Sequence, residues 1–212
     1  MTQSSAISAQ GTDLQIETGS GTTIAVTGIV VGNPTILTAA GVKNGTVVTL
    51  SGFTGANASE INNQSFVATN ATAGTFAIQV NTTGKDIEGL AASALQKAYT
   101  SVANVKNWSG FDGQAAEVDV THLRSKAREI RLGLQDFGSI SFDINPDYED
   151  AGQNAMRASK AAASRLNYKL TYPNGKVASF GAYVRAMPES GAVDEVIGGS
   201  AELRIDGEVI VA

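Results

Sequence analysis

The clearest pattern in the chain is an alternation of apolar and polar side chains with a period of two. Residues 139–145 place Ile140, Phe142 and Ile144 on one face and polar side chains on the other. The same alternation recurs in residues 165–172, and residues 176–185 are expected as the return strand after an Asn-Gly pair at 174–175. This period predicts half-buried antiparallel strands. The Asn-Gly pair predicts a tight hairpin between the last two.

Shorter β-rich runs, separated by turn residues, extend this pattern over most of the chain. We expect them to form strands at 13–17, 24–31, 35–39, 46–51, 65–69, 75–80, 98–108, 115–120, 129–134, 193–197, 202–205 and 209–211. A helical period follows residue 145, where Asn145 is expected as the N-cap and Pro146 as the first helical residue. The expected helix has small residues, such as Ala151 and Ala155, along one face. The chain is therefore predicted to be mainly β with one α-helix.

The distribution of charge divides the chain into a host domain and an insert. Between Gly19 and Gly84 the only charged side chains are Lys43 and Glu60, and the segment is rich in Thr, Val, Asn and Gly. We therefore expect residues 23–97 to form a small all-β module. Its last part, 85–97, is expected to be a return linker with a helical turn. Residues 1–22 and 98–212 would form a discontinuous β domain, in which 12–19 pairs with 98–108.

The bulk composition excludes several classes of function. The 212-residue chain has a formal net charge of −5, which disfavours a general nucleic-acid-binding protein. It has no cysteine, so disulfides and thiol chemistry are excluded. No segment is apolar enough to span a bilayer. Residues 1–12 lack a basic region followed by an apolar region, so we expect no secretory signal and production in the cytoplasm.

No constellation of residues in the sequence predicts catalysis or metal binding. His122 is the single histidine, so a catalytic triad would have one available base. The acidic residues that start at Asp143 have the spacing of an EF-hand loop at first. However, Tyr148 occupies the position that requires Gly, and Asn154 the one that requires a bidentate Glu. We therefore predict no metal, no cofactor and no enzymatic activity.

A basic cluster lies between two of the predicted strands and is the best candidate for an interaction surface. In an extended hairpin arm, Arg124, Lys126 and Arg128 would point to one side. The cluster could contact nucleic acid or an acidic patch on a neighbouring subunit, or it could be an ordinary solvated loop. The overall negative charge favours the subunit over nucleic acid, and the solvated loop stays open as an alternative. The candidate interface residues are His122, Leu123, Arg124, Lys126, Arg128 and Arg131.

The region around this cluster resembles the major tail (tail tube) protein of long-tailed bacteriophages. The resemblance covers residues 115–157 and follows the order EVDVTH, a basic excursion, GLQDFG, an alternating strand and DYEDAGQ. It extends to TDLQIETG near the start of the chain and to SAELRIDGEV near its end. The insert is similar to small β modules that occur inside such proteins, through the pieces NPTILTAAG and GTVVTLSGFTGA.

The resemblance implies a tail-tube-like β-sandwich or barrel with one flanking α-helix. It implies self-assembly into stacked rings, hexameric in this family, that form a tube together with other tail proteins. DNA would leave the capsid through the acidic lumen without specific binding. The protein would be part of the virion tail, assembled in the host cytoplasm, with the insert outside the tube. Two alternatives remain: a surface-exposed β-rich module that binds a glycan or host surface, and a tube protein of a contractile secretion system.

Overall fold

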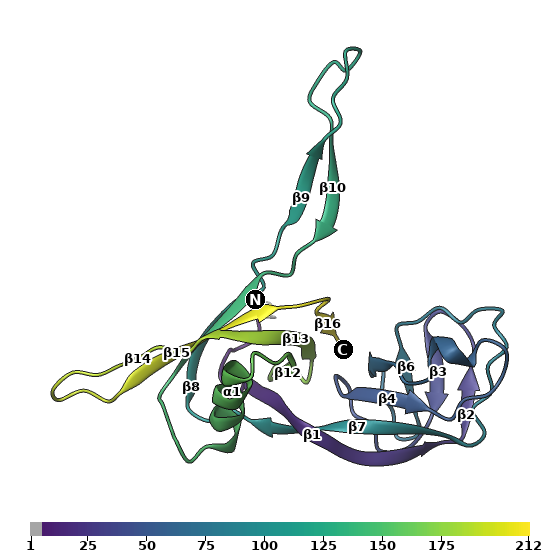
Figure 1. Cartoon of the computed structure of the whole chain (residues 1–212), viewed down its shortest axis with the longest axis horizontal. Coiled ribbons are helices and arrows are strands. Elements are labelled where there is room, and N and C mark those ends of the chain that lie inside the picture. Colours follow the sequence, from purple (N-terminus) through teal and green to yellow (C-terminus); the bar gives the residue numbers. More distant parts are fainter. Residues whose placement is uncertain (1–5) are drawn as a thin grey trace, which may run out of the picture. The chain divides into compact units, whose positions relative to one another are not determined.

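The computed structural model describes residues 6–212 and shows a mainly β chain with one α-helix (Figure 1). Residues 1–5 belong to the segment in which no secretory signal is expected, and they lie outside the described residues. The described chain divides into two compact units. Unit 1 comprises the described residues up to Val102 together with Asn167–Ser179 and Ile210–Ala212. Unit 2 comprises Ala103–Leu166 and Phe180–Val209. The expected mainly β class with one helix is confirmed.

Unit 1 is built around one long strand, β1 (Asp13–Val26). It pairs antiparallel with β7 (Ala92–Ser101) and with β12 (Leu166–Thr171). Its first residues pair with Tyr99, Thr100 and Ser101, which confirms the pairing predicted between 12–19 and the segment from residue 98. Two interruptions of the register accompany Gly19 to Gly21, where the sequence predicts the end of the strand. The strand continues because β7 keeps pairing with it beyond these irregularities.

The rest of unit 1 consists of short strands around one apolar core. β4 (Val47–Ser51) pairs with β7 and with β5 (Ser65–Val67), and a 3₁₀ turn covers Ala58–Glu60. A second sheet contains β2 (Gly28–Val30), β3 (Thr35–Thr38) and β6 (Thr75–Ile78). The core includes Val26, Leu37, Leu50, Phe53 and Phe76, and every one of its members lies between residues 24 and 94.

The second part of the segment expected as a return linker is a strand. β7 begins at Ala92, and residues 85–91 contain turns and an isolated bridge from Glu88 to Thr54. The expected helical turn is wrong. β7 is favoured because it pairs with β1 on one side and with β4 on the other, so its backbone groups are satisfied within the sheet.

Unit 2 contains antiparallel strands and the helix. The strands β8 (Val105–Gly110), β11 (Ser139–Ile144) and β15 (Gly198–Ile205) are antiparallel neighbours. The second half of β13 (Val177–Ala186) pairs with β15, and β14 (Glu189–Ser190) pairs with the start of β15. In β11 the predicted alternation is confirmed, because Ile140, Phe142 and Ile144 are buried. The first residues of β13 belong to unit 1, where they pair with β16 (Ile210–Val211).

The helix α1 (Ala151–Ala161) starts later than the sequence predicts. The N-cap is Asp150, whose side chain accepts a hydrogen bond from the Gln153 N–H at 2.7 Å. Asn145 and Pro146 lie before the helix, so the expected cap is wrong. Of the predicted small-residue face, Ser159 is buried and Ala151 is exposed, and the other buried residues of α1 are Gly152, Gln153 and Met156.

Candidate functional site

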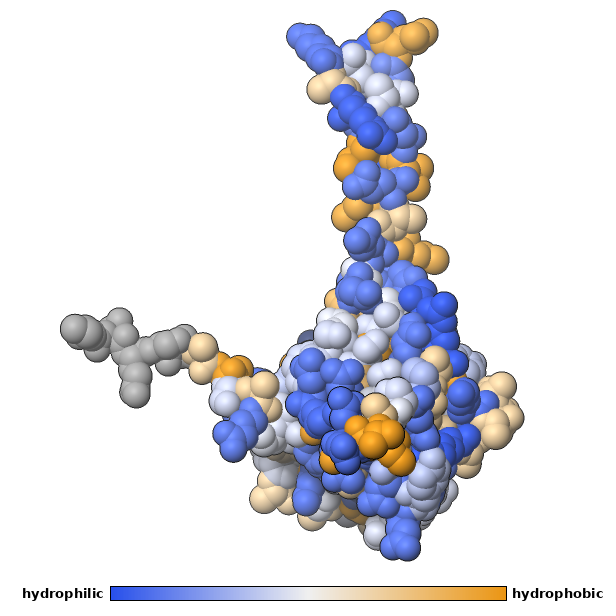
Figure 2. All heavy atoms as spheres, turned by 90° about the vertical axis from the view of Figure 1, so that its left-hand side faces the viewer, coloured by the Kyte–Doolittle hydropathy of each residue, from blue (hydrophilic) through white to orange (hydrophobic). Residues whose placement is uncertain are grey.

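A two-stranded hairpin in unit 2 carries the basic cluster. β9 (Ala115–Asp119) and β10 (Ile130–Gln135) pair with each other and form a sheet of their own. We call residues 115–135 the arm. Ala115 is half-buried and the other residues of both strands are exposed. Figure 2 shows apolar side chains in orange between polar ones along the arm. The arm exposes six large apolar side chains: Val118, Val120, Leu123, Ile130, Leu132 and Leu134.

Each face of the arm combines apolar and charged side chains. In the ladder Leu132 lies opposite Glu117, and Ile130 lies opposite Asp119, so these four share one face. Val118 and Arg131 lie opposite each other on the other face. A two-stranded hairpin is at best marginally stable by itself in water, and exposed apolar patches mark interaction sites. The arm therefore has the composition of a surface that is covered by a partner.

The tip of the arm, residues 121–128, is a closed turn rather than an extended strand. The Ser125 N–H donates to the His122 carbonyl oxygen at 2.8 Å, which places Leu123 and Arg124 at the corner. His122 Nδ1 accepts from the Arg124 N–H at 3.1 Å, and Ser125 Oγ accepts from the His122 N–H at 3.1 Å. The expectation that the basic side chains point to one side assumed an extended strand, and residues 121–128 do not form one.

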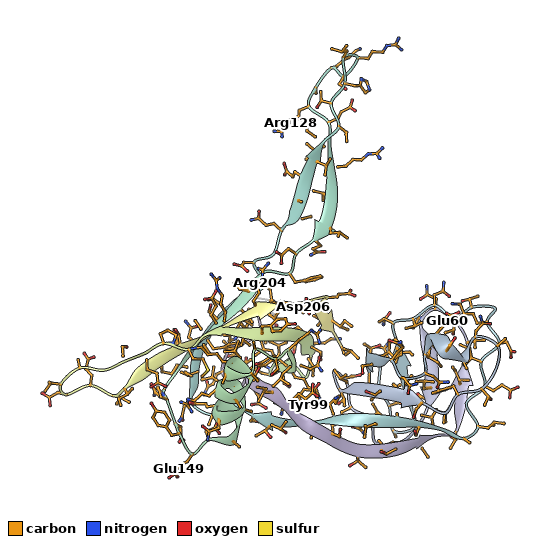
Figure 3. The ribbon with its side chains drawn as sticks, in the orientation of Figure 1. Glu60, Tyr99, Arg128, Glu149, Arg204 and Asp206 are labelled. Atoms are coloured by element: carbon orange, nitrogen blue, oxygen red, sulfur yellow. The ribbon has the colours of Figure 1, made fainter. Side chains whose placement is uncertain are left out.

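Two of the three basic side chains at the tip are free to pair with a partner. Arg128, labelled in Figure 3, forms an ion pair with Asp119 at 3.4 Å. Within residues 6–212, Arg124 and Lys126 have no ion-pair partner, and neither has Arg131 on β10. Hydrogen bonds from Thr121, with a contribution from Arg128, lower the pKa of the Asp119 carboxyl. The structure thus brings all six predicted interface residues onto one exposed arm.

The root of the arm is held by two aspartates. Asp112 Oδ1 accepts from the Ser139 N–H and Asp136 Oδ1 from the Gly138 N–H, both at 2.8 Å. Asp136 also forms an ion pair with Arg204, which Figure 3 labels on β15. Hydrogen bonds from the backbone of Gly138 and from Arg204 lower the pKa of the Asp136 carboxyl. These contacts connect the entry and the exit of the arm to the sheet of unit 2.

Gly113 allows the entry and the exit of the arm to approach each other at this root, so replacing it should disrupt the root. A Cβ atom added to Gly113 would overlap the carbonyl oxygen of Asp136 and the backbone of Phe137. We expect Gly113→Ala to lower the free energy of unfolding by about 2 kcal/mol, the usual cost of overpacking. Trp108 is the single tryptophan and lies in unit 2, so its fluorescence can follow denaturant unfolding.

The control for this substitution is Gly74→Ala. A Cβ atom at Gly74 meets nothing within 4 Å, and this glycine has no positive φ. Gly74→Ala should therefore unfold within about 0.5 kcal/mol of the parent chain. Equal stabilities of the two variants would show that the root tolerates a Cβ atom at Gly113.

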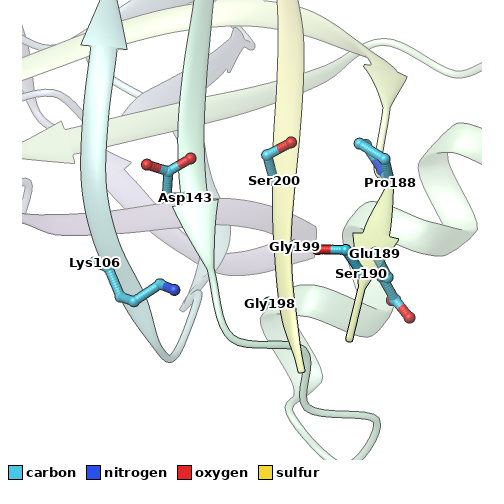
Figure 4. A pocket seen from close by; sticks show the side chains of 8 residues that line it. All are labelled: Lys106, Asp143, Pro188, Glu189, Ser190, Gly198, Gly199 and Ser200. Atoms are coloured by element: carbon cyan, nitrogen blue, oxygen red, sulfur yellow. The ribbon is translucent and has the colours of Figure 1, made fainter. Parts of the chain in front are cut away.

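A concave surface of unit 2 lies away from the arm. Figure 4 shows a pocket of about 360 Å³ beside β14 and β15, where Lys106, Asp143 and Glu189 are the charged lining residues. Among residues 6–212 no group of three or more His, Cys, Asp or Glu side chains is placed to hold a metal ion. In the same part of the chain, no helix has the length and apolar character needed to cross a membrane.

The sequence did not predict the apolar part of the arm. These side chains lie in or beside the strands predicted at 115–120 and 129–134, and the pattern does not indicate what covers them. Leu134 is 93% exposed and Leu132 is 69% exposed. The mixed character of both faces follows from the register of the two strands, which places Glu117 and Asp119 on the same face as Leu132 and Ile130.

One family model matches the part of the chain that carries the arm. The family model of the lambda phage tail tube protein (TTP) matches residues 81–212, which is more than half of the chain. No curated protein matches the chain. The matched region includes the whole arm, α1 and the strands of unit 2. The chain therefore belongs to the lambda phage tail tube protein family and is a structural component of the phage virion tail, assembled in the host cell.

Proposed function

We propose that the chain assembles with itself into stacked hexameric rings, which form the tail tube through which DNA leaves the capsid. The arm makes a principal contact between subunits, through His122, Leu123, Arg124, Lys126, Arg128 and Arg131 and through its exposed apolar side chains. The observation that carries this proposal is the arm itself, which exposes six large apolar side chains in a family of tube proteins. Other tail proteins are the expected partners at the ends of the tube.

We also propose that residues 23–97 are a separate module within this tube protein. One observation supports it: the apolar core of the module draws all its members from residues 24–94. The module lies on the outside of the tube, because a domain of this size on the inside would block the channel. The tube then needs only residues 1–22 and 98–212 for its wall.

The charge of the chain suits a conduit for DNA. The net charge of −5 makes strong nonspecific attachment to the phosphate backbone unfavourable, since such attachment depends on an excess of Lys and Arg. DNA passes through the lumen without specific binding, and no cofactor or catalytic step is involved.

The apolar side chains of the arm give the most direct test. We expect Leu132→Thr combined with Leu134→Thr to prevent tube formation, because it removes apolar area that subunit contact buries. Threonine keeps the preference for a strand, so the hairpin itself should persist. Negative-stain electron microscopy and analytical ultracentrifugation of concentrated protein, with and without a tail-tip initiator complex, measure the result.

The control is Leu90→Thr, which changes a side chain that is 82% exposed and lies outside the arm. This variant should form tubes as the parent chain does. If the parent chain stays monomeric even with an initiator complex, the tube itself is disproved for this protein. Normal tubes from the Leu132 and Leu134 double variant would instead remove the arm from the subunit interface.

A further inference from the structure

The loop that joins β14 to β15, residues 191–197, has a surface that complements the tip of the arm; we call it the acceptor loop. The Glu195 N–H donates to the Ala192 carbonyl oxygen at 3.3 Å, which closes a turn with Val193 and Asp194 at its corner. Val193 is 91% exposed and Val196 is 78% exposed. A strand was predicted at residues 193–197, and this prediction is wrong, because the chain turns here.

Each turn has one apolar and one charged residue at its corner, and the two charged residues have opposite signs. The corner of the arm tip presents Leu123, which is fully exposed, and Arg124. The corner of the acceptor loop presents Val193 and Asp194. The tip contains Arg124, Lys126 and Arg128 and no acidic residue, whereas residues 189–197 contain three carboxylates and no basic residue.

The unpaired charges on the two surfaces are equal in number. At the tip, Arg128 is engaged by Asp119. Near the acceptor loop, Glu189 is engaged by Arg157 at 3.4 Å and accepts from the Tyr148 hydroxyl at 2.6 Å. Within residues 6–212 no ion pair involves Asp194 or Glu195. The acceptor loop therefore has two unpaired negative charges, and the arm tip has two unpaired positive charges.

We propose that the acceptor loop of one copy of this chain receives the arm tip of a neighbouring copy. The inference rests on the proposed tube and specifies the surface on which the arm docks. Val193 and Val196 pack against Leu123, while Asp194 and Glu195 pair with Arg124 and Lys126. Two different surfaces of one chain meet in this contact, so it is heterologous. Such a contact repeats from copy to copy and generates rings or filaments, as a tube requires.

Engineered cysteines can test this contact cleanly because the chain has none of its own. In tubes of the variant Leu123→Cys with Val193→Cys, mild oxidation should produce a ladder of disulfide-linked multimers on a non-reducing gel. A control variant combines Leu123→Cys with Leu90→Cys, whose second site is also exposed but lies outside the acceptor loop. It should give less than about a tenth of the multimers, since a disulfide requires Cα atoms within about 7 Å of each other.

The outcomes separate this inference from the function on which it rests. Tubes that form but show no ladder, or a ladder equal to that of the control, overturn the acceptor loop and leave the tube intact. Absence of tubes from the parent chain overturns both. As a second measurement, Arg124→Glu and Glu195→Lys should each raise the concentration needed for assembly about tenfold, and their combination should restore it. Failure of the combination to restore assembly counts against direct pairing.

Discussion

Replacing Gln153 by methionine should lower the free energy of unfolding by about 3 kcal/mol. The Gln153 side chain is fully buried, and it connects the start of α1 to two other backbone segments of unit 2. Its Oε1 accepts from the Asp147 N–H at 2.9 Å, and its Nε2 donates to the carbonyl oxygens of Ala103 and Asn145, both at 3.0 Å. Methionine fills a similar volume but leaves three backbone groups without this partner. Each lost bond costs about 1 kcal/mol.

The control for this substitution is Asn154→Leu, at the next position of the same helix. Asn154 also has an amide side chain and donates to the Tyr148 carbonyl oxygen at 2.7 Å, but it is exposed. Water can replace its bonds, so we expect a loss within about 0.5 kcal/mol. Denaturant unfolding followed by Trp108 fluorescence measures both variants. A change smaller than about 1 kcal/mol for Gln153→Met would contradict the assigned role.

The same residues explain why the sequence misplaced the helix start. Asn145, Asp147 and Asp150 are all short polar side chains that can accept a hydrogen bond from a free helical N–H. The choice among them depends on tertiary contacts. The Asn145 carbonyl and the Asp147 N–H are used by Gln153, and Asp147 Oδ1 accepts from the Glu149 N–H at 2.9 Å. The segment is thereby held in turns, and the helix begins only after Asp150.

The strands were easier to predict than the helix start, because a period of two in the apolar residues indicates a strand with one buried face. Ile140, Phe142 and Ile144 alternate with polar residues, and they are buried as that pattern requires. The pattern fails where neighbouring strands decide the outcome. Ala92 to Lys97 became a strand because two partners were available, and residues 193–197 became a turn because their backbone follows β14 back into β15.

The sequence predicted the basic part of the candidate site but not its apolar part. The basic tip from His122 to Arg128 is visible in the sequence as a run of charge. What the period of two cannot show is whether a strand has a neighbour above its apolar side chains. In β10 the exposure of Leu132 and Leu134 became evident only from the structure, because the arm pairs within itself. The sequence pattern of a strand is the same whether its apolar face is covered by the same chain or by another subunit.

A second residue whose environment the alternation did not reveal is Lys169 on β12. It alternates with the buried Tyr168 and Leu170 and faces the other way, yet it is only 8% exposed. Its Nζ donates to Thr46 Oγ1 at 3.0 Å and lies 3.8 Å from the centre of the Tyr99 ring. Burial, together with the charge of Lys43, lowers the pKa of the Lys169 ammonium to about 8. No carboxylate among residues 6–212 forms an ion pair with it.

This burial should make the chain more stable as the pH rises from 8 to 10. In the unfolded chain the lysine has a pKa of about 10.4, so between pH 8 and 10 the unfolded state binds more protons than the folded state. The free energy of unfolding therefore increases with pH, by about 2 kcal/mol over this range. Below pH 8 the full cost of burying the charge is present. Above pH 10 the gain ends, because burial raises the pKa of the Tyr99 hydroxyl and ionisation then favours the unfolded chain.

Lys169→Met should abolish most of this rise, since methionine occupies the same site without a titrating group. The control is Lys176→Met, which removes an exposed lysine from the same unit and should leave the slope unchanged. Urea unfolding followed by far-ultraviolet circular dichroism at pH 8, 9 and 10 measures all three proteins. A flat profile for the parent chain, or an equal slope in Lys169→Met, would show that the ammonium is solvated in the folded protein. A rise that disappears only in Lys169→Met would establish that β12 buries this charge against Tyr99 and Thr46.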